Sequence, residues 1–229
     1  AGLGGSGVGF SLSAGIQQDN FLGTGNKVSF NLNTAKTSKT YAFDFFNPYH
    51  NLDSVSRSFG FTFKTTKTDN TDTVTDYEAD RTTFKYSYGL PMTENNRFNL
   101  SLKYVNWKIG ATSKSSDEVV EFINLNGEDF DNFSFLINYT IDTRDSSQMT
   151  RSGFKTNLSS EVLVPGSDLE YYKVYFQTDS YFLINKPKDV ILRLKGIAKY
   201  GQGYGGTKGL PFYDRYKAGG PKTVRGYEK

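Results

Sequence analysis

The sequence predicts an all-β fold: an antiparallel transmembrane β-barrel that is incomplete, with about ten strands present. Three features predict it. Apolar residues alternate with polar ones through long segments, charged residues avoid the apolar positions, and short connections alternate with long ones. Only 36% of the 229 residues are hydrophobic, although 16% are aromatic, and no run reaches the ~18 apolar residues of a membrane helix. A barrel needs apolar residues at alternate positions only, so low hydropathy is compatible with it.

Ten segments show this alternation, and each is predicted to be one strand. In chain order they are 8–16, 28–32, 41–45, 59–63, 84–90, 98–104, 133–141, 154–164, 172–182 and 190–200. A period of two predicts strands rather than helices. With their flanking residues the strands are roughly 9–12 residues long, about twice the usual length in soluble proteins, which favours a barrel over the alternative, a soluble β-sandwich. Within 104–109 the apolar phase slips by one residue, and a β-bulge is the simplest interpretation.

The two faces of these strands are expected to meet different solvents. The residues predicted to face lipid include Phe30, Phe43, Phe61, Tyr86, Leu100, Phe135, Val174 and Leu192. The charged residues that fall in the opposite phase are Asp44, Lys64, Lys85, Lys103, Lys173, Asp179, Arg193 and Lys195. Arg57 is an exception, but it lies near a strand end, where the cost of facing lipid falls towards zero. A Lys or Arg that faces lipid at mid-bilayer costs ~2–4 kcal/mol, so this separation predicts a lipid-facing wall and a polar lumen.

The connections support the same fold. Every second connection is short: 18–26, 47–54, 91–96, 146–153 and 185–189. The other set includes three long ones, at 68–81, at 113–131 and from 202 onward. Short turns on one side and long loops on the other are typical of outer-membrane barrels.

Composition and motifs argue against several other functions. The net charge of +3 is spread among acidic residues, so no nucleic-acid partner is expected. Cysteine is absent and His50 is the only histidine, so we expect no metal, no cofactor and no enzymatic activity. Two G-x-G-x-x-G matches, at 2–7 and 201–206, lack the following helix that a nucleotide site requires. The acidic loop 69–80 is interpreted as solvated.

The segment 202–229 is predicted to be a long loop directed into the lumen. It carries Pro211-Phe212-Tyr213, Ala218-Gly219-Gly220 and Val224-Arg225-Gly226-Tyr227. Long ordered loops usually serve function or fill a lumen. An Arg flanked by small residues can reach carboxylates in a polar lumen, although Arg-Gly-Tyr taken alone is a weak signal and favours a surface Arg.

The motif Val224-Arg225-Gly226-Tyr227 resembles the signature of a superfamily of barrel insertases and two-partner secretion transporters. Other runs are similar to the BamA family in particular, and they keep its order along nearly the whole chain. These runs are 15–25, 47–49, 164–174, 211–213 and 218–220. Each run alone is a weak signal, and the specificity lies in their combination.

The resemblance implies a barrel of roughly sixteen strands in the bacterial outer membrane, preceded by periplasmic domains. Arg225 would pair with acids on later strands, with Val224, Gly226 and Tyr227 completing the motif. Loop support would come from Gly219, Gly220, Phe212 and Tyr213. By comparison with the family, the first strand is missing or reduced to 1–5, and the periplasmic domains and later strands are missing. We therefore expect 1–229 to be a single partial barrel domain, a fragment of the protein.

The implied function is folding and insertion of other barrel proteins, as the central component of the outer-membrane assembly machinery. A seam between first and last strands would open, and a client strand would pair with the exposed edge. The implied partners are lipoproteins of the assembly complex, unfolded outer-membrane protein clients, and membrane lipids with lipopolysaccharide. The alternative is a two-partner secretion transporter or a porin-like channel.

Overall fold

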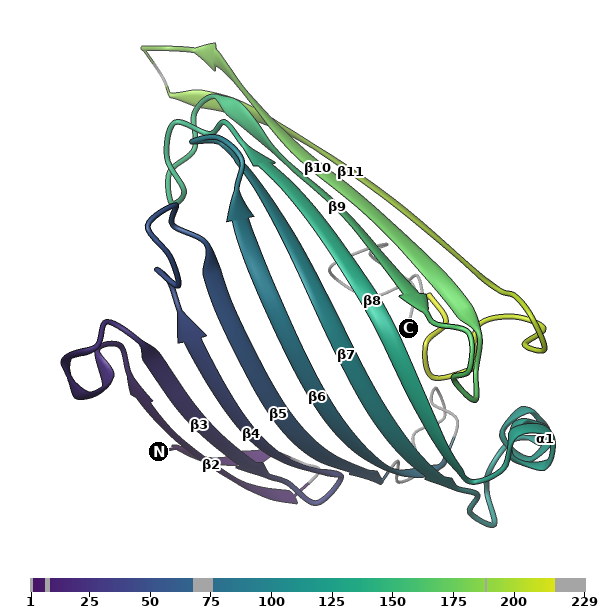
Figure 1. Ribbon diagram of the computed structural model, residues 1–229. Helices are drawn as coiled ribbons and strands as arrows, with labels where there is room; N and C mark the ends of the chain where they lie inside the picture. The colour runs from purple at the N-terminus through teal and green to yellow at the C-terminus, as the bar shows by residue number, and fades with distance from the viewer. Residues whose placement is uncertain (1, 7–8, 68–75, 188, 217–229) are drawn as a thin grey trace.

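The computed structural model describes residues 2–6, 9–67, 76–187 and 189–216. These residues form one antiparallel sheet of eleven strands, in which every strand pairs with its neighbours in sequence (Figure 1). The strands are β1 (Gly2–Ser6), β2 (Gly9–Gln18), β3 (Lys27–Thr34), β4 (Ser38–Asn47), β5 (Ser56–Lys67), β6 (Glu78–Pro91), β7 (Asn96–Gly110), β8 (Asp129–Asp142), β9 (Gly153–Leu163), β10 (Tyr171–Asn185) and β11 (Val190–Gly203).

The predicted fold class is confirmed. The ten predicted segments correspond in order to β2–β11, and the short β1 adds an eleventh strand where the sequence predicted a missing or reduced one. The longest strands, β7 and β10, have 15 residues each, more than the predicted length. The sheet curls strongly but stays open, because β1 and β11 each pair on one side only within the described part of the chain (Figure 1).

The register places the apolar residues of neighbouring strands on one face. Phe43 lies opposite Phe30 on β3 and opposite Phe61 on β5. Because pairing is antiparallel and the side-chain period is two, the remaining residues of each strand share the other, inner face. Lys85 and Lys103 lie opposite each other on that inner face.

The predicted β-bulge near the end of β7 is wrong. The register of β7 runs without a shift along both β6 and β8. The apolar phase slips because Val105, Trp107 and Ile109 point inward, and Val105 and Ile109 are buried. Their apolar surroundings come from segments distant in sequence, which alternation within β7 cannot reveal.

The connections lie as predicted at the two ends of the sheet. The turns after β2, β4, β6, β8 and β10 gather at one end, whereas helix α1 (Asp117–Asn126) and the segment 204–216 lie at the other (Figure 1). The first short turn is closed by the side chain of Asn20, whose Oδ1 accepts a hydrogen bond from the Gly25 amide at 2.7 Å. No helix within the described residues is long and apolar enough to cross a membrane.

Candidate functional site

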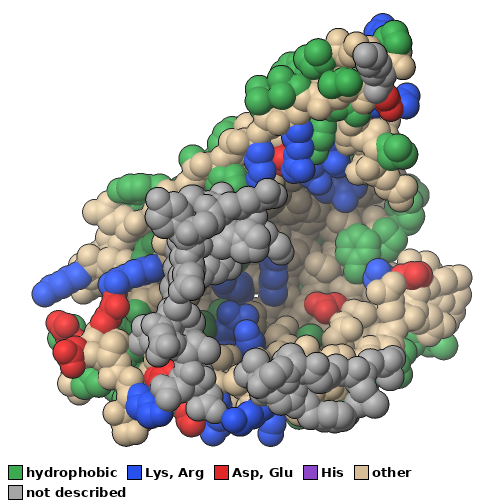
Figure 2. All heavy atoms as spheres, turned by 180° about the vertical axis from the view of Figure 1, so that it is seen from behind, with side chains coloured by type: hydrophobic (Ala, Val, Ile, Leu, Met, Phe, Trp, Pro, Cys, Tyr) green, Lys and Arg blue, Asp and Glu red, His purple; other side chains and the backbone are tan. Residues whose placement is uncertain are grey.

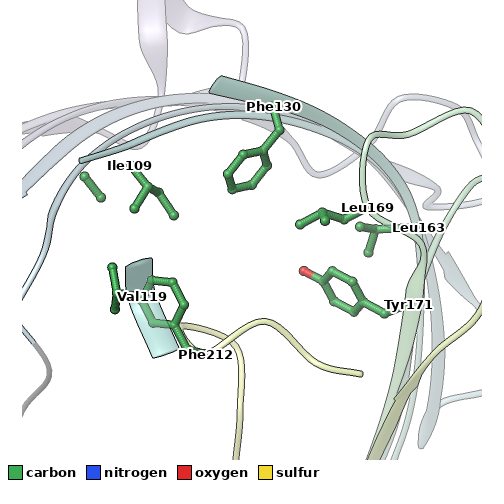
Figure 3. Packing of buried hydrophobic residues seen from close by; sticks show 8 residues of the cluster. Ile109, Val119, Phe130, Leu163, Leu169, Tyr171 and Phe212 are labelled. Carbon is green, nitrogen blue, oxygen red and sulfur yellow. The ribbon is translucent and has the colours of Figure 1, made fainter. Parts of the chain in front are cut away.

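An apolar cluster covers the inner face of the sheet at the end that carries α1. Its buried members are Ala79, Ile109, Val119, Phe130, Leu163, Leu169, Tyr171 and Phe212 (Figure 3). They come from five strands, α1 and two loops, so the cluster exists only when distant segments meet. Burying a side chain such as Phe or Val stabilises a fold by about 1.5–3 kcal/mol, so the cluster holds both α1 and the segment 204–216 against the sheet.

Phe212 and Tyr213, the two predicted loop-support residues within the described chain, both lie in or against this cluster. The Phe212 ring packs edge-on against Phe122 of α1 at 5.4 Å. The centroid of the Tyr213 ring lies 4.4 Å from that of Trp107 and 6.2 Å from that of Phe130, on which the ring stacks. Burial raises the pKa of Tyr213 well above its ordinary value, and the neighbouring Asp214 carboxylate raises it further, so the hydroxyl stays neutral.

Directly beside the apolar cluster, four charged residues of alternating sign form an ion-pair ladder. Lys103 on β7 contacts Glu161 on β9, and Glu161 contacts Lys173 on β10 at 3.1 Å. Lys173 in turn contacts Asp214, in the segment after β11, at 2.7 Å. The Tyr171 hydroxyl donates a second hydrogen bond to Asp214 at 2.6 Å. The ladder therefore connects the middle of the wall to the segment that leads toward Arg225.

Two further contacts fix the same segment. Arg215 forms an ion pair with Glu118 at the start of α1, and the Tyr204 hydroxyl donates to the backbone carbonyl of Leu163. Beside the ladder the inner face is hollowed, with a volume of about 690 Å³. Its lining is mostly polar and includes Lys85, Ser87, Asn99, Asn138 and Tyr175. Figure 2 shows Lys and Arg side chains gathered inside the hollow of this face.

The sequence predicted some of these residues and missed others. Lys103 and Lys173 were placed in the inward phase, and both lie in the ladder. Glu161 and Asp214 were not singled out, because nothing local in the sequence indicates which acid a lysine meets. Helix α1 was also missed, although Ser116-Asp117-Glu118 followed by Val119, Phe122 and Ile123 has the acidic start and apolar spacing of a short amphipathic helix.

The residues predicted to face lipid all lie on the face opposite the ladder. Five of them are exposed: Phe30, Phe61, Leu100, Phe135 and Leu192. The other three, Phe43, Tyr86 and Val174, are half-buried between neighbouring side chains. Ser134 lies on the inner face at 3% exposure and donates a hydrogen bond to Glu161 of the ladder.

Several predicted residues are not brought to this site. Val224, Arg225, Gly226, Tyr227, Gly219 and Gly220 lie outside the described residues. His50 lies in the turn after β4, with its ring 6.0 Å from that of Tyr88. Gly201 and Gly203 end β11 and are followed by a turn rather than a helix, and the described residues contain no group of three potential metal ligands.

Comparisons with known proteins agree with this geometry. A family model described as the Omp85 superfamily domain matches residues 20–229. The chain is 28% identical over 232 residues to the outer membrane protein assembly factor BamA of Neisseria meningitidis serogroup B, an alignment that covers 96% of this chain and 29% of that protein.

The fold is also similar to a solved structure. The crystal structure of BamA from Haemophilus ducreyi lacking POTRA domains 1–3 matches with a TM-score of 0.86 and 25% identity, covering 97% of this chain and 44% of that one. The chain thus spans less than half the length of either relative. The family match, the relatives and the curled sheet together show that the chain belongs to the Omp85 superfamily and forms part of a β-barrel of the bacterial outer membrane.

Proposed function

We propose that this protein folds and inserts other β-barrel proteins into the outer membrane, as the central component of the assembly machinery. The observation that carries the proposal is the match of residues 20–229 to the Omp85 superfamily, together with the likeness to two BamA proteins. In this role the partners are lipoproteins of the assembly complex and unfolded outer-membrane clients, with lipids and lipopolysaccharide around the wall. The work is done by strand pairing rather than by enzymatic chemistry.

The proposed mechanism is templating at the edge of the sheet. Within the described residues β1 pairs only with β2, and three of its five residues are glycine. Glycine weakens a strand and its register, so β1 is the edge that exchanges partners most easily. A client strand in lipid has no water to satisfy its backbone amides and carbonyls, and pairing with β1 supplies these hydrogen bonds.

The lumen loop would keep the wall in shape while the edge opens. The ion-pair ladder and the apolar cluster hold the segment 204–216 on the inner face, which starts the loop on the lumen side. We propose that Arg225, farther along this loop, pairs with carboxylates in the lumen. Arg225→Ala is then expected to impair assembly of a reporter barrel more than Lys222→Ala does. Equal effects of the two substitutions would count against the loop assignment.

Edge templating is tested with proline, which removes a backbone donor. The backbone amides of successive residues in a strand point to opposite sides. Of the two variants Leu3→Pro and Gly4→Pro, one therefore removes an amide donor that faces β2. The other removes an amide donor that faces the free edge. Glu94→Pro, in the exposed turn between β6 and β7, is the control. The assay follows folding of a reporter barrel into vesicles that contain the full-length protein. Slower folding with both β1 variants supports templating, and rates equal to the control refute it.

A further inference from the structure

The outer face of β6, β7 and β8 changes its chemistry in ordered steps along the strands. Cross-strand pairing arranges the outer residues in rows, and the two rows nearest α1 are polar: Asp80–Lys108–Asp129 and Thr82–Asn106–Asp131. The next row is aromatic: Phe84–Tyr104–Phe133. The Tyr104 hydroxyl donates a hydrogen bond to Asp131 at 2.8 Å, toward the polar rows. Because aromatic girdles lie at membrane interfaces, this row marks the border of the hydrocarbon on the side of α1.

The apolar band that begins at this border is short. On β8 the outer residues from the border to the turn are Phe133, Phe135, Ile137, Tyr139 and Ile141, and the strand ends at Asp142. The eight steps from Phe133 to Ile141, at about 3.4 Å each, measure roughly 27 Å along the strand. A strand tilt of about 35–45° reduces this length to roughly 19–22 Å along the membrane normal. Since the apolar band of an outer-membrane barrel is about 25 Å tall, the strand alone falls short by about 3–6 Å.

The turns beyond these strand ends expose apolar side chains. Each of the four turns after β2, β4, β6 and β8, which gather at one end of the sheet (Figure 1), presents a large apolar side chain that is 62–104% exposed: Leu22, Leu52, Met92 and Met149. At the α1 end, the described connections 35–37, 111–116 and 164–170 carry no exposed large apolar side chain. Single exposed apolar residues are ordinary on a soluble surface. One in each of four consecutive turns at the same end indicates a common apolar surrounding.

The backbone of Leu22 supports this interpretation. Its φ of 53° lies in the left-handed region, which glycine, asparagine and aspartate adopt far more readily than leucine. In water, an asparagine at this position would relieve the backbone and remove an exposed apolar side chain at the same time. A leucine is favoured here only if its side chain leaves water for an apolar medium.

We propose that Leu22, Leu52, Met92 and Met149 form an apolar rim that inserts into the periplasmic leaflet of the membrane. Short turns lie on the periplasmic side of outer-membrane barrels, which identifies the leaflet. The rim supplies the few ångströms of apolar height that the strands lack, and the polar rows at the α1 end stand outside the hydrocarbon. Successive turns are two strands apart, about 10 Å, so the rim consists of separate points. Fluid lipid accepts separate anchors, whereas a protein partner needs a contiguous patch.

The test places a single cysteine at each rim position in turn and labels it with a fluorophore. The 229 residues contain no cysteine, and any cysteine elsewhere in the full-length protein is replaced by serine. The protein is reconstituted into phospholipid vesicles with iodide on both sides of the membrane, or with lipids that carry a nitroxide near the headgroup. Labels on the rim should be quenched by the nitroxide lipid and protected from iodide. A label at Lys36, exposed in the turn between β3 and β4 at the α1 end, is the control and should respond to iodide alone.

Urea unfolding from bilayers gives an independent test. Leu22→Asn should lower the urea midpoint, because the lost lipid contact outweighs the relief of the backbone. Ser54→Asn is the matched control: Ser54 also has a left-handed φ, 58°, in an exposed turn, but it has no apolar side chain, so its midpoint should hold or rise.

The proposal is overturned if the rim labels respond to iodide as the Lys36 label does. It is also overturned if they are protected from both quenchers, which indicates that protein covers the turns. A rise in the urea midpoint of Leu22→Asn that matches or exceeds that of Ser54→Asn overturns it as well.

Discussion

Replacing Lys173 with Met is expected to loosen the lumen segment more than any other single charge removal in the ladder. Lys173 is 17% exposed and contacts both Glu161 and Asp214, which are 14% and 30% exposed. Breaking a fully buried pair costs about 3–5 kcal/mol. Here Glu161 keeps Lys103, and Asp214 keeps the Tyr171 hydroxyl and some solvent, so the expected loss is about 1–3 kcal/mol.

The assay is urea unfolding of the full-length protein in detergent, combined with limited proteolysis of the segment 204–216. A purely local loss of charge would lower stability but leave proteolysis unchanged, whereas release of the segment speeds cleavage. The double variant Lys173→Met with Asp214→Asn removes the carboxylate that Lys173→Met leaves without its cation, while Glu161 keeps Lys103, so it should recover part of the stability. The reasoning is refuted if Lys173→Met lies within about 0.5 kcal/mol of the unmodified protein, or if the double variant is no more stable than Lys173→Met alone.

Three other predictions concern the wall, the apolar cluster and the turns. Phe135→Lys should destabilise the protein in bilayers by ~2–4 kcal/mol, whereas Ser87→Lys, in the polar hollow, should cost much less. Equal losses of stability, measured by unfolding in bilayers, would contradict the assignment of the two faces. Val119→Ala should cost roughly 1–3 kcal/mol because Val119 is fully buried, and Val120→Ala, 40% exposed on the same helix, should change urea stability by less than about 0.5 kcal/mol. Gly153 and Gly166 both have φ +95°, but a Cβ at Gly153 meets the Thr143 carbonyl oxygen, whereas a Cβ at Gly166 meets nothing within 4 Å. Gly153→Ala should therefore lower Tm more than Gly166→Ala, and an equal decrease would show that conformational strain alone decides.

The strands were predictable because their signal is local. In a strand between lipid and water, apolar residues recur at every second position. Segments such as 98–104 and 133–141 therefore reveal both their secondary structure and their two faces, even when the neighbouring strands are not known. The same reasoning failed near Trp107, where the inner face is apolar and the outer residues Asn106 and Lys108 are polar. Local alternation cannot distinguish a change of register from a change in what covers the inner face.

The site was only partly predictable. Phe212 and Tyr213 were identified through a motif, but the motif does not indicate that they pack on Phe130 and Trp107. Asp214 meets Lys173 across 41 residues, and Glu161 joins Lys103 to Lys173. Such contacts depend on strand order, register and the path of the segment after β11. None of these can be read from the sequence around the contacting residues.

The amino-acid sequence by itself determined the class of fold, the number and order of the long strands, and which residues of each strand share a face. Periodicity carries that information because the side chains on the two faces of a strand meet different solvents. Only the tertiary structure decided which charges pair, where α1 packs, and which side chains form the apolar cluster on the inner face. These features require residues tens of positions apart to come within a few ångströms, and the geometry of the folded sheet alone sets those distances.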